Sequence, residues 1–457
     1  MARKIRSGLT TTQIIAFGFL AGILIGTFLL MLPISSAEGM WTAPIDAAFT
    51  ATTSLCVTGL VTVNTMRHWS FFGQAVILFL IQFGGLGVVT FTTTVLLLLR
   101  KKITLKDRLL IQDAYNLDTL RGLVKLTIDI LKGTLLLEGI GACFYMIKFI
   151  PEFGVAYGIW ASVFNAVSAM CNAGMDIVSD YSLMPYQTSL LVNGTTIALI
   201  ILGGIGFPVW WDALRGLREK KEKKYSFCKM LSKLSLHSKV VLSMTVALIF
   251  GGALIIFLLE YSNPDTIGGL SLPHKLLAAL FQSVTTRTAG FLTIPQECLR
   301  DTTSFICILL MFVGGSPSGT AGGVKTTTVA MMVVAVISVI KGREDTEAFH
   351  RKIPSNLVKK GMAVVLISMA VLEASVICLS IAEAGSFMDI FYECTSALAT
   401  VGLSKGLTAD LSVAGKLILI VTMYIGRIGP ITMALFFNRS KKKGQHRTLP
   451  EGSILVG

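Results

Sequence analysis

Four short loops, each built around one glycine, are the strongest candidates for chemistry in this chain. They read Cys-Val-Thr-Gly-Leu over residues 56–60, Cys-Asn-Ala-Gly-Met over 171–175, Thr-Ala-Gly-Phe over 288–291 and Thr-Val-Gly-Leu over 400–403. Their glycines are 115, 116 and 112 residues apart. Glycine adopts positive φ without steric cost, so its recurrence at this spacing indicates one backbone conformation used four times. We call these segments the first to fourth glycine loops.

Four such loops around one axis would form a cation filter. A dehydrated monovalent cation needs several oxygen ligands, and backbone carbonyls supply them without net charge, so that the ion can also leave. Ordinary helix–turn packing is the alternative, but it accounts poorly for a fourfold match. The predicted ion-binding residues, which would bind K⁺ through their carbonyls, are Cys56, Val57, Thr58, Gly59, Cys171, Asn172, Ala173, Gly174, Arg287, Thr288, Ala289, Gly290, Ala399, Thr400, Val401 and Gly402.

One polar side chain stands one or two residues before each of the four glycines and is expected to orient the loop backbone by hydrogen bonding. These are Thr58, Asn172, Thr288 and Thr400. Ordinary helix capping would explain them equally well.

Residues 314–325 read Gly-Gly-Ser-Pro-Ser-Gly-Thr-Ala-Gly-Gly-Val-Lys and interrupt an apolar run from 303 to 339. So many glycines and a proline cannot remain a straight helix, and irregular backbone is tolerated at membrane depth only inside protein or beside a water-filled cavity. A phosphate-binding loop is excluded by pattern, because Val324 rather than glycine precedes Lys325. We call this stretch the glycine-rich segment.

Ionisable residues within apolar runs are costly in lipid and usually face the protein interior. Four of them are of interest here: Glu138, Lys325, Glu373 and Arg427. Arg427 lies 25 residues after Gly402 and should sit below the fourth loop. The simpler interpretation is a structural ion pair between Arg427 and Glu138 or Glu373.

The composition is that of a polytopic membrane protein. Of 457 residues, 53% are hydrophobic and 14% charged, with a mean hydropathy of +0.72; soluble domains carry about 25% charged residues. The net charge of +14 does not indicate nucleic-acid binding, because the basic residues cluster in alternate loops. The eight cysteines and five histidines show no metal-site or redox spacing.

Apolar runs long enough to cross a bilayer alternate with shorter ones. A span needs about 20 apolar residues, and the shorter runs of about a dozen reach only partway, as re-entrant helices do. The eight predicted spans are 12–33, 71–99, 123–149, 187–211, 239–260, 303–339, 361–382 and 413–437. The four predicted re-entrant helices are 44–55, 158–170, 273–286 and 386–399.

The charge distribution predicts the orientation. The N-terminus, the segments 100–125, 215–239 and 341–360, and the tail from Arg439 hold 30 of the 40 Lys and Arg residues. Basic residues mark the cytoplasmic side. We therefore expect both termini in the cytoplasm and all four re-entrant loops entering from outside.

The predicted fold is an all-α membrane protein of four parallel span–re-entrant helix–span repeats around a central pore. The repeats are 1–100 (filter 56–60), 101–225 (filter 171–175), 226–345 (filter 287–291, segment 314–325) and 346–457 (filter 399–403, with a cytoplasmic tail). Glycine pairs recur in the second span of each repeat, at Gly84-Gly85, Gly203-Gly204, Gly314-Gly315 and the degenerate Gly426 to Gly429, and predict close helix packing.

With these motifs the chain resembles the membrane subunit of the Ktr/Trk/HKT superfamily of potassium transporters, and is most similar to its KtrB- and NtpJ-type branch over residues 10–440. The resemblance implies a multi-pass protein of the bacterial cytoplasmic membrane that carries K⁺ down its electrochemical gradient. Gly59 favours potassium over sodium, by analogy with the plant branch. It also implies that an intramembrane gate lies below the filter, formed by Gly314, Gly315, Ser316, Gly319, Gly322, Gly323, Lys325 and Arg427.

The resemblance further implies a homodimer on a cytosolic ring of nucleotide-binding, RCK-type regulatory subunits, with sodium as a possible activator and no organic cofactor. Membrane lipid would be the other partner. The alternatives are a sodium-permeable or sodium-coupled transporter of the same fold and, in other classes, an alternating-access symporter or a membrane enzyme. Parallel repeats argue against the symporter, and no cluster of His, Asp, Glu or Cys supports an enzyme.

Overall fold

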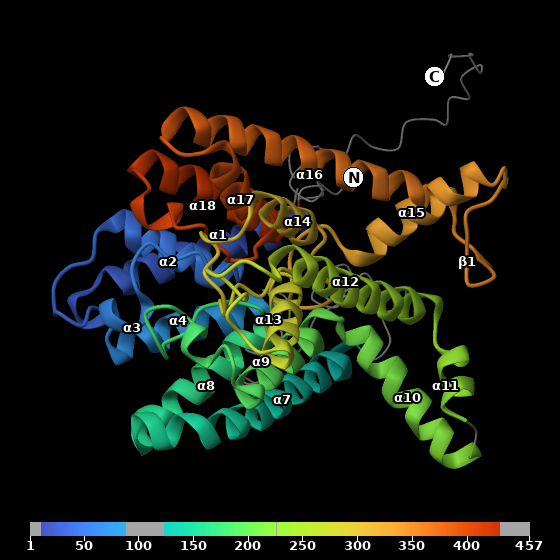
Figure 1. Ribbon diagram of the computed structural model, residues 1–457, viewed down its shortest axis with the longest axis horizontal. Coiled ribbons are helices and arrows are strands. Elements are labelled where there is room, and N and C mark those ends of the chain that lie inside the picture. The colour runs from blue at the N-terminus through green and yellow to red at the C-terminus, as the bar shows by residue number, and fades with distance from the viewer. Residues whose placement is uncertain (1–10, 88–122, 225, 430–457) are drawn as a thin grey trace, which may run out of the picture.

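The computed structural model describes residues 11–87, 123–224 and 226–429, and these are almost entirely helical (Figure 1). Within this part of the chain, four helices are long and apolar enough to cross a membrane: α1 (Thr11–Met31), α7 (Leu123–Phe153), α12 (Leu236–Glu260) and α16 (Ser355–Ala382). They match the predicted spans 12–33, 123–149, 239–260 and 361–382. The basic N-terminus, most of 100–125 and the tail from Arg439 lie outside the described residues.

Each long helix is followed by a short one that ends at a glycine loop. These are α2 (Pro44–Cys56), α8 (Val155–Cys171), α13 (Leu272–Thr285) and α17 (Phe387–Ala399). Their 13 to 17 residues rise about 20–25 Å. Proline in the first turn of α2 and α13, and the Ser386 side chain accepting from the Asp389 amide of α17, favour helix initiation at these points.

The helices that follow the glycine loops are short or broken. They are α4 (Phe71–Leu86), α9 (Leu190–Gly204) continued by α10 (Phe207–Lys223), α14 (Asp301–Phe312) continued by α15 (Thr326–Ile340), and α18 (Val413–Ile428). The interruption predicted within 303–339 is present. The ends of the predicted spans 71–99 and 413–437 lie outside the described residues.

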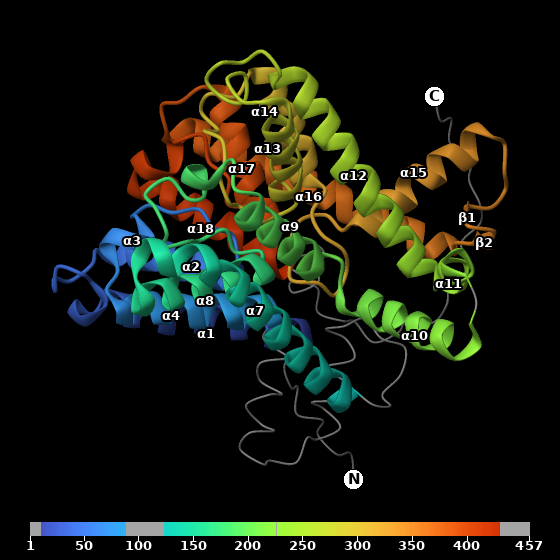
Figure 2. The same ribbon diagram turned by 60° about the horizontal axis from the view of Figure 1, so that its bottom comes forward.

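The predicted span over 187–211 is not one continuous helix. Helices α9 and α10 meet at a bend of 99°, and α10 runs away from the bundle (Figure 2). Gly206 adopts φ +89 at the bend, and Pro208 lies in the first turn of α10. The predicted loop 215–239 is correspondingly helical in large part, since it holds the end of α10 and α11 (Phe227–Lys233).

The remaining elements are small. They are α3 (Thr65–His68), the 3-10 turns η1 (Pro33–Ser35), η2 (Met184–Tyr186) and η3 (Leu407–Asp410), and the strands β1 (Glu347–Ala348) and β2 (Arg351–Lys352). The two strands pair antiparallel in a hairpin at the edge of the molecule (Figure 2), which the sequence did not predict.

The core lies around the short helices and the glycine loops that follow them. Each short helix buries one aromatic side chain completely, nine or ten residues before its glycine: Phe49, Phe164, Phe281 and Tyr392. The long helices instead expose large apolar side chains such as Leu24 and Phe250, which are 62% and 64% exposed. Apolar residues on the outer face of long helices suit a lipid surround.

Candidate functional site

Three of the four glycine loops leave their helices in the same conformation. In α2, α8 and α17 the residue two before the glycine takes a left-handed φ, and its amide bonds to a carbonyl three residues back at 3.2 Å. The next amide bonds five residues back at 2.8 Å. These two bonds form a Schellman cap, which turns the chain sharply at the helix end. The third loop differs, because Ala289 bonds to Thr285 at 2.9 Å instead.

The four loops meet in a closed ring. Each glycine has positive φ: +98 at Gly59, +68 at Gly174, +81 at Gly290 and +95 at Gly402. A Cβ on each glycine would overlap a carbonyl oxygen of the next loop: Gly59 faces Ala173, Gly174 faces Ala289, Gly290 faces Val401 and Gly402 faces Thr58. The contacts run from the first loop to the fourth and back to the first. We call this arrangement the glycine ring.

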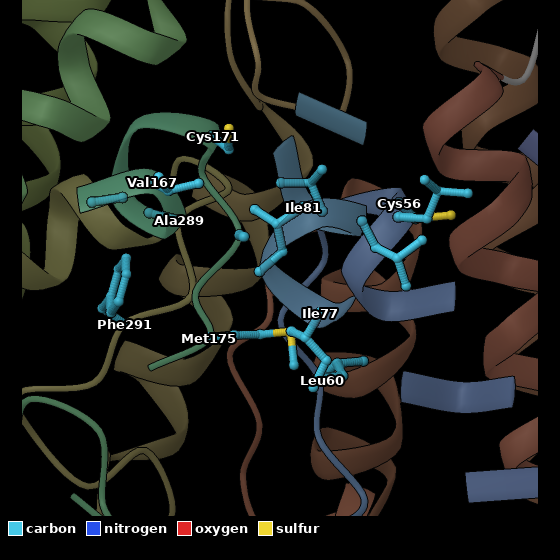
Figure 3. Packing of buried hydrophobic residues seen from close by; sticks show 14 of the residues in the cluster. Cys56, Leu60, Ile77, Ile81, Val167, Cys171, Met175, Ala289 and Phe291 are labelled. Atoms are coloured by element: carbon cyan, nitrogen blue, oxygen red, sulfur yellow. The ribbon is translucent and has the colours of Figure 1, made fainter. Parts of the chain in front are cut away.

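The residue after each glycine anchors the ring from outside. Leu60, Met175, Phe291 and Leu403 are all buried to within 1%. Figure 3 shows Met175 reaching from the second loop toward Leu60 of the first and Ile77 of α4. The Met175 sulfur also lies 3.5 Å from the Ser54 hydroxyl. Apolar packing therefore fixes how close the loops approach each other.

The electrostatics of the ring favour cations. The C-terminal ends of α2, α8, α13 and α17 all lead into it, and a helix C-terminus carries roughly half a negative charge. On one side the four glycines line a cavity of about 340 Å³, here called the vestibule, which also holds Asp176, Asp180 and Glu297. Asp180 is paired with Arg67 there.

The polar residues predicted to orient the loops do not make the expected bonds. The side chains of Thr58, Asn172, Thr288 and Thr400 are buried and lack a hydrogen-bond partner within the described chain. Hydroxyl groups near the ends of the preceding short helices accept hydrogen bonds from the loop amides instead. Thr53 Oγ1 accepts the Gly59 amide at 2.9 Å, and Ser396 Oγ accepts the Gly402 amide at 3.0 Å.

In the helices that follow the glycine loops, the glycine pairs pack directly against backbone atoms next to the ring. A Cβ on Gly84, Gly203 or Gly426 would overlap the carbonyl oxygen of Leu55, Met170 or Leu398, each four residues before a ring glycine. The helices also end just beyond, at Gly87, Gly206 and Gly429, all with positive φ. The predicted close packing is thus present, and the same glycine clusters also end the helices.

The glycine-rich segment lies beside the ring, between the second and fourth glycine loops. Ser316 and Thr320 donate their amides to Gly204 and Gly203 at 2.9 and 3.1 Å, and Phe207 donates to Ser318 at 3.1 Å. Thr320 Oγ1 also donates to the Met170 carbonyl at 3.1 Å. On the other side, a Cβ on Gly322 would overlap the Thr400 hydroxyl.

Arg427 forms hydrogen bonds to the backbone of this segment and of α4, and not an ion pair with an acidic side chain. Its guanidinium donates to the Thr320 carbonyl at 2.6 Å and to the Gly84 carbonyl at 2.5 Å. The alternative of an ion pair with Glu138 or Glu373 is therefore wrong. Glu138 accepts from Gln82 at 3.4 Å, and Glu373 is exposed on α16. Lys325 donates to the Ala321 carbonyl at 2.7 Å and so braces the segment internally.

Thr320 is the residue of this region that the sequence did not single out. Its amide, hydroxyl and carbonyl connect the segment to α9, to the end of α8 and to Arg427. Nothing in its local sequence distinguishes it from Ser316 or Ser318. Thr53 and Ser396 are recognisable from the sequence as polar residues near the ends of the short helices, and both stand six residues before a ring glycine.

Comparisons with known proteins agree on one family. The family model described as TrkH, cation transport protein, matches residues 5–446. The chain is 40% identical to Ktr system potassium uptake protein B of Bacillus subtilis, covering 98% of this chain and 97% of that one. It is 39% identical to potassium/sodium uptake protein NtpJ of Enterococcus hirae, covering 100% and 99%. The crystal structure of TrkH from Vibrio parahaemolyticus superposes with a TM-score of 0.72 at 17% identity, covering 96% of this chain and 87% of that one.

Proposed function

The chain belongs to the TrkH family of cation transport proteins, in its KtrB- and NtpJ-like branch, and from this membership we propose that it takes up potassium through the glycine ring. It is a multi-pass membrane transporter and not an enzyme. The proposed pore passes along the axis of four span–re-entrant helix–span repeats, with the vestibule on the outside. The membrane potential would drive entry, at about 2.3 kcal/mol per charge for each 100 mV.

The cyclic contact pattern of the four glycines carries this proposal. Four carbonyls from equivalent positions approach the neighbouring glycine in turn, which is the arrangement that replaces the water shell of a dehydrated cation. The four helix C-termini add a favourable field without placing a fixed charge in the path. A fixed carboxylate in the ring would instead hold the ion too strongly for rapid release.

Ion flux through the purified protein in liposomes tests the proposal. We expect uptake of a rubidium tracer, competed by potassium and much less by sodium. Empty liposomes and the Gly290→Ser variant are the controls. If sodium passes as readily as potassium, the protein is still a cation pore, but the proposal that it selects potassium is refuted.

A sodium-permeable or sodium-coupled transporter is the second candidate. The printed name of the Enterococcus relative includes sodium, and that relative covers the whole chain. Sodium flux measured without potassium distinguishes permeation from coupling, because a coupled transporter moves sodium only when potassium is also present. Sodium as an activator would raise the potassium flux without itself being carried.

We propose that the glycine-rich segment is the gate below the ring. The roles of Gly314, Gly315, Ser316, Gly319, Gly322, Gly323, Lys325 and Arg427 in gating rest on this assignment. Its support is the position of Gly322 against Thr400 and the bonds to Gly203 and Gly204. Shortening 314–323 should raise the flux with little change in selectivity. A flux that stays at the wild-type level would argue against a gate here.

The proposed assembly is a homodimer on a cytosolic ring of nucleotide-binding regulatory subunits. Glu373 supports the dimer, because it is exposed on the membrane span α16 and has no ion-pair partner in the described part of the chain. A charge facing lipid is costly, and a second protomer would cover it. The tail Ile454–Gly457, a further candidate contact, lies outside the described residues. Cross-linking in membranes tests the dimer.

A further inference from the structure

Helix α10 runs away from the bundle (Figure 2), and its contacts place it at one surface of the membrane. A Cβ on Gly133 of α7 would lie 3.3 Å from the Trp210 ring of α10. Gly133 stands 20 residues before Phe153, the last residue of α7, so about 30 Å of helix, the thickness of a bilayer core, separates the two. Asp212 of α10 accepts the amide of Ser235, the N-cap of the span α12, at 2.9 Å. The first turns of α10 therefore lie where α12 begins and where one bilayer thickness of α7 is complete.

One face of α10 carries apolar side chains that extend beyond the bundle. Leu214 and Leu217 follow Trp210 by four and seven residues, which places all three on one side of a helix. The two leucines are 46% and 48% exposed. Helix α11 packs on another side of α10, since a Cβ on Gly216 would lie 3.1 Å from Met230. The face formed by Trp210, Leu214 and Leu217, here called the α10 apolar face, is thus open at its two leucines.

Basic side chains continue this face toward the end of the helix. Arg218 and Lys221 are both exposed, and they stand one turn after Leu214 and Leu217. Residues 215–224 hold six Lys and Arg against two Glu. Such side chains can lay their stems along an apolar surface while the charged end stays in the headgroup layer. Tryptophan is also enriched at that depth. A helix with this distribution of residues lies in the interface of a membrane that contains anionic lipid.

We propose that α10 lies in the headgroup layer and binds anionic lipid there, with Leu214 and Leu217 in the upper acyl region and Arg218 and Lys221 against lipid phosphates. The bend of 99° makes this possible, because α9 runs with the spans and α10 then continues along the surface. A cytosolic protein is the less favoured occupant, because the level of α10 keeps its apolar face where lipid is already present. The proposal rests on the membrane location of the chain and not on the ion that it carries.

Fluorescence quenching tests where the α10 apolar face lies. A bimane label is attached to Leu217→Cys or to Glu222→Cys in the full-length protein, reconstituted in nanodiscs of phosphatidylcholine and phosphatidylglycerol. Glu222 is the matched control, because it is exposed and lies about 140° around the same helix from Leu217. A nitroxide on the lipid acyl chain should quench the label at 217 roughly threefold more than the label at 222, and aqueous iodide should do the reverse. Both variants carry serine at four other cysteines, Cys143, Cys228, Cys298 and Cys378, and the remaining four are buried.

The headgroup is tested by placing the nitroxide on either phosphatidylglycerol or phosphatidylcholine in otherwise identical nanodiscs. The anionic carrier should quench the label at 217 more strongly. Arg218→Gln with Lys221→Gln should lower that preference about twofold, since each basic residue near an anionic surface contributes to the attraction. The control, Arg351→Gln with Lys352→Gln, removes two exposed charges from the hairpin and should leave the preference unchanged.

Two results would overturn the proposal. Equal quenching by the two carriers would show that α10 does not select anionic lipid. A label at 217 that iodide quenches and the lipid nitroxide does not would place the α10 apolar face in water, open to a cytosolic protein. Neither result bears on potassium uptake, which the flux measurement tests separately.

Discussion

At the residue scale, Gly290 is constrained in two independent ways. Its φ of +81 is closed to most side chains, and a Cβ there would overlap the Val401 carbonyl and lie 3.1 Å from the Gly174 Cα. Gly290→Ser must therefore displace a ring carbonyl. We expect potassium affinity or selectivity over sodium to fall roughly tenfold, in line with 1–3 kcal/mol of local strain, while expression and dimerisation stay intact.

Gly251→Ser is the matched control for this substitution. Gly251 lies in α12 with no atom within 4 Å of an added Cβ, so flux should be unchanged. Competition between rubidium and sodium in liposomes measures both variants. Wild-type potassium affinity and sodium discrimination in Gly290→Ser would mean that the third loop lies outside the filter.

Asp176 makes a prediction about external pH. It lies in the loop after α8, lines the vestibule, and burial raises the pKa of its carboxyl to about 6, although bonds from Ser182 and the Val178 and Ser179 amides oppose that rise. Above this pH the carboxylate is charged and attracts cations; below it the group is neutral. Potassium affinity should therefore fall as external pH drops from 7 to 5.

Because asparagine carries no charge, the Asp176→Asn variant should show the low potassium affinity at every pH from 5 to 7. The measurement is the half-saturating external potassium concentration as a function of pH. Asp180 and Glu297 also face the vestibule, so Asp180→Asn and Glu297→Gln identify any contribution of theirs. An unaltered pH profile in Asp176→Asn would assign the titration to another group.

At the element scale, Arg427 fastens the glycine-rich segment to α4. It donates to the Thr320 and Gly84 carbonyls, and hydrogen bonds from a charged group contribute about 1.5–3 kcal/mol each. Arg427→Gln should release the segment and raise the potassium flux roughly tenfold with unchanged selectivity. Arg343→Gln, an exposed residue paired with Glu347, is the control. A lower flux in Arg427→Gln would show that the arginine holds the pore open instead.

The helices that could be predicted are those determined by the local sequence. Apolar run length placed the long helices, and the short helices lie within three residues of the predicted ranges at every boundary. The bend at Gly206 was missed because Gly-Pro patterns permit a break without requiring it. What completes that break is distant in sequence: the Phe207 amide bonds to Ser318. The hairpin of β1 and β2 is too short to show any periodicity.

The sequence identified the glycines of the candidate site, but it did not predict which atoms they and their neighbours contact. Spacing alone identified the four glycines, because the same positive-φ backbone conformation recurs in each of the four loops. The bonding of Thr58, Asn172, Thr288 and Thr400 was predicted wrongly, because the helix cap is made by backbone amides together with Thr53 and Ser396. The two partners of Arg427 are backbone carbonyls, which no pattern of side chains reveals.

At the scale of the whole molecule, the basic loops and the vestibule should lie on opposite sides of the membrane. Cys298 is exposed near the vestibule residue Glu297, whereas Glu344 is exposed beside the basic hairpin. Desolvation, with the charges of Glu297 and Asp265, raises the pKa of the Cys298 thiol, so labelling is best done at mildly alkaline pH. A membrane-impermeant maleimide added to intact cells should label wild type.

The same reagent should not label Cys298→Ser in intact cells. In the double variant Cys298→Ser, Glu344→Cys, label should appear only after the membrane is permeabilised, because basic loops remain on the cytoplasmic side. The exposed Cys143 and Cys378 lie within α7 and α16, where lipid shields them from a polar reagent. The reverse pattern would place the vestibule inside the cell. Asp176 would then respond to internal rather than external pH, and the glycine-rich segment would close the pore from outside.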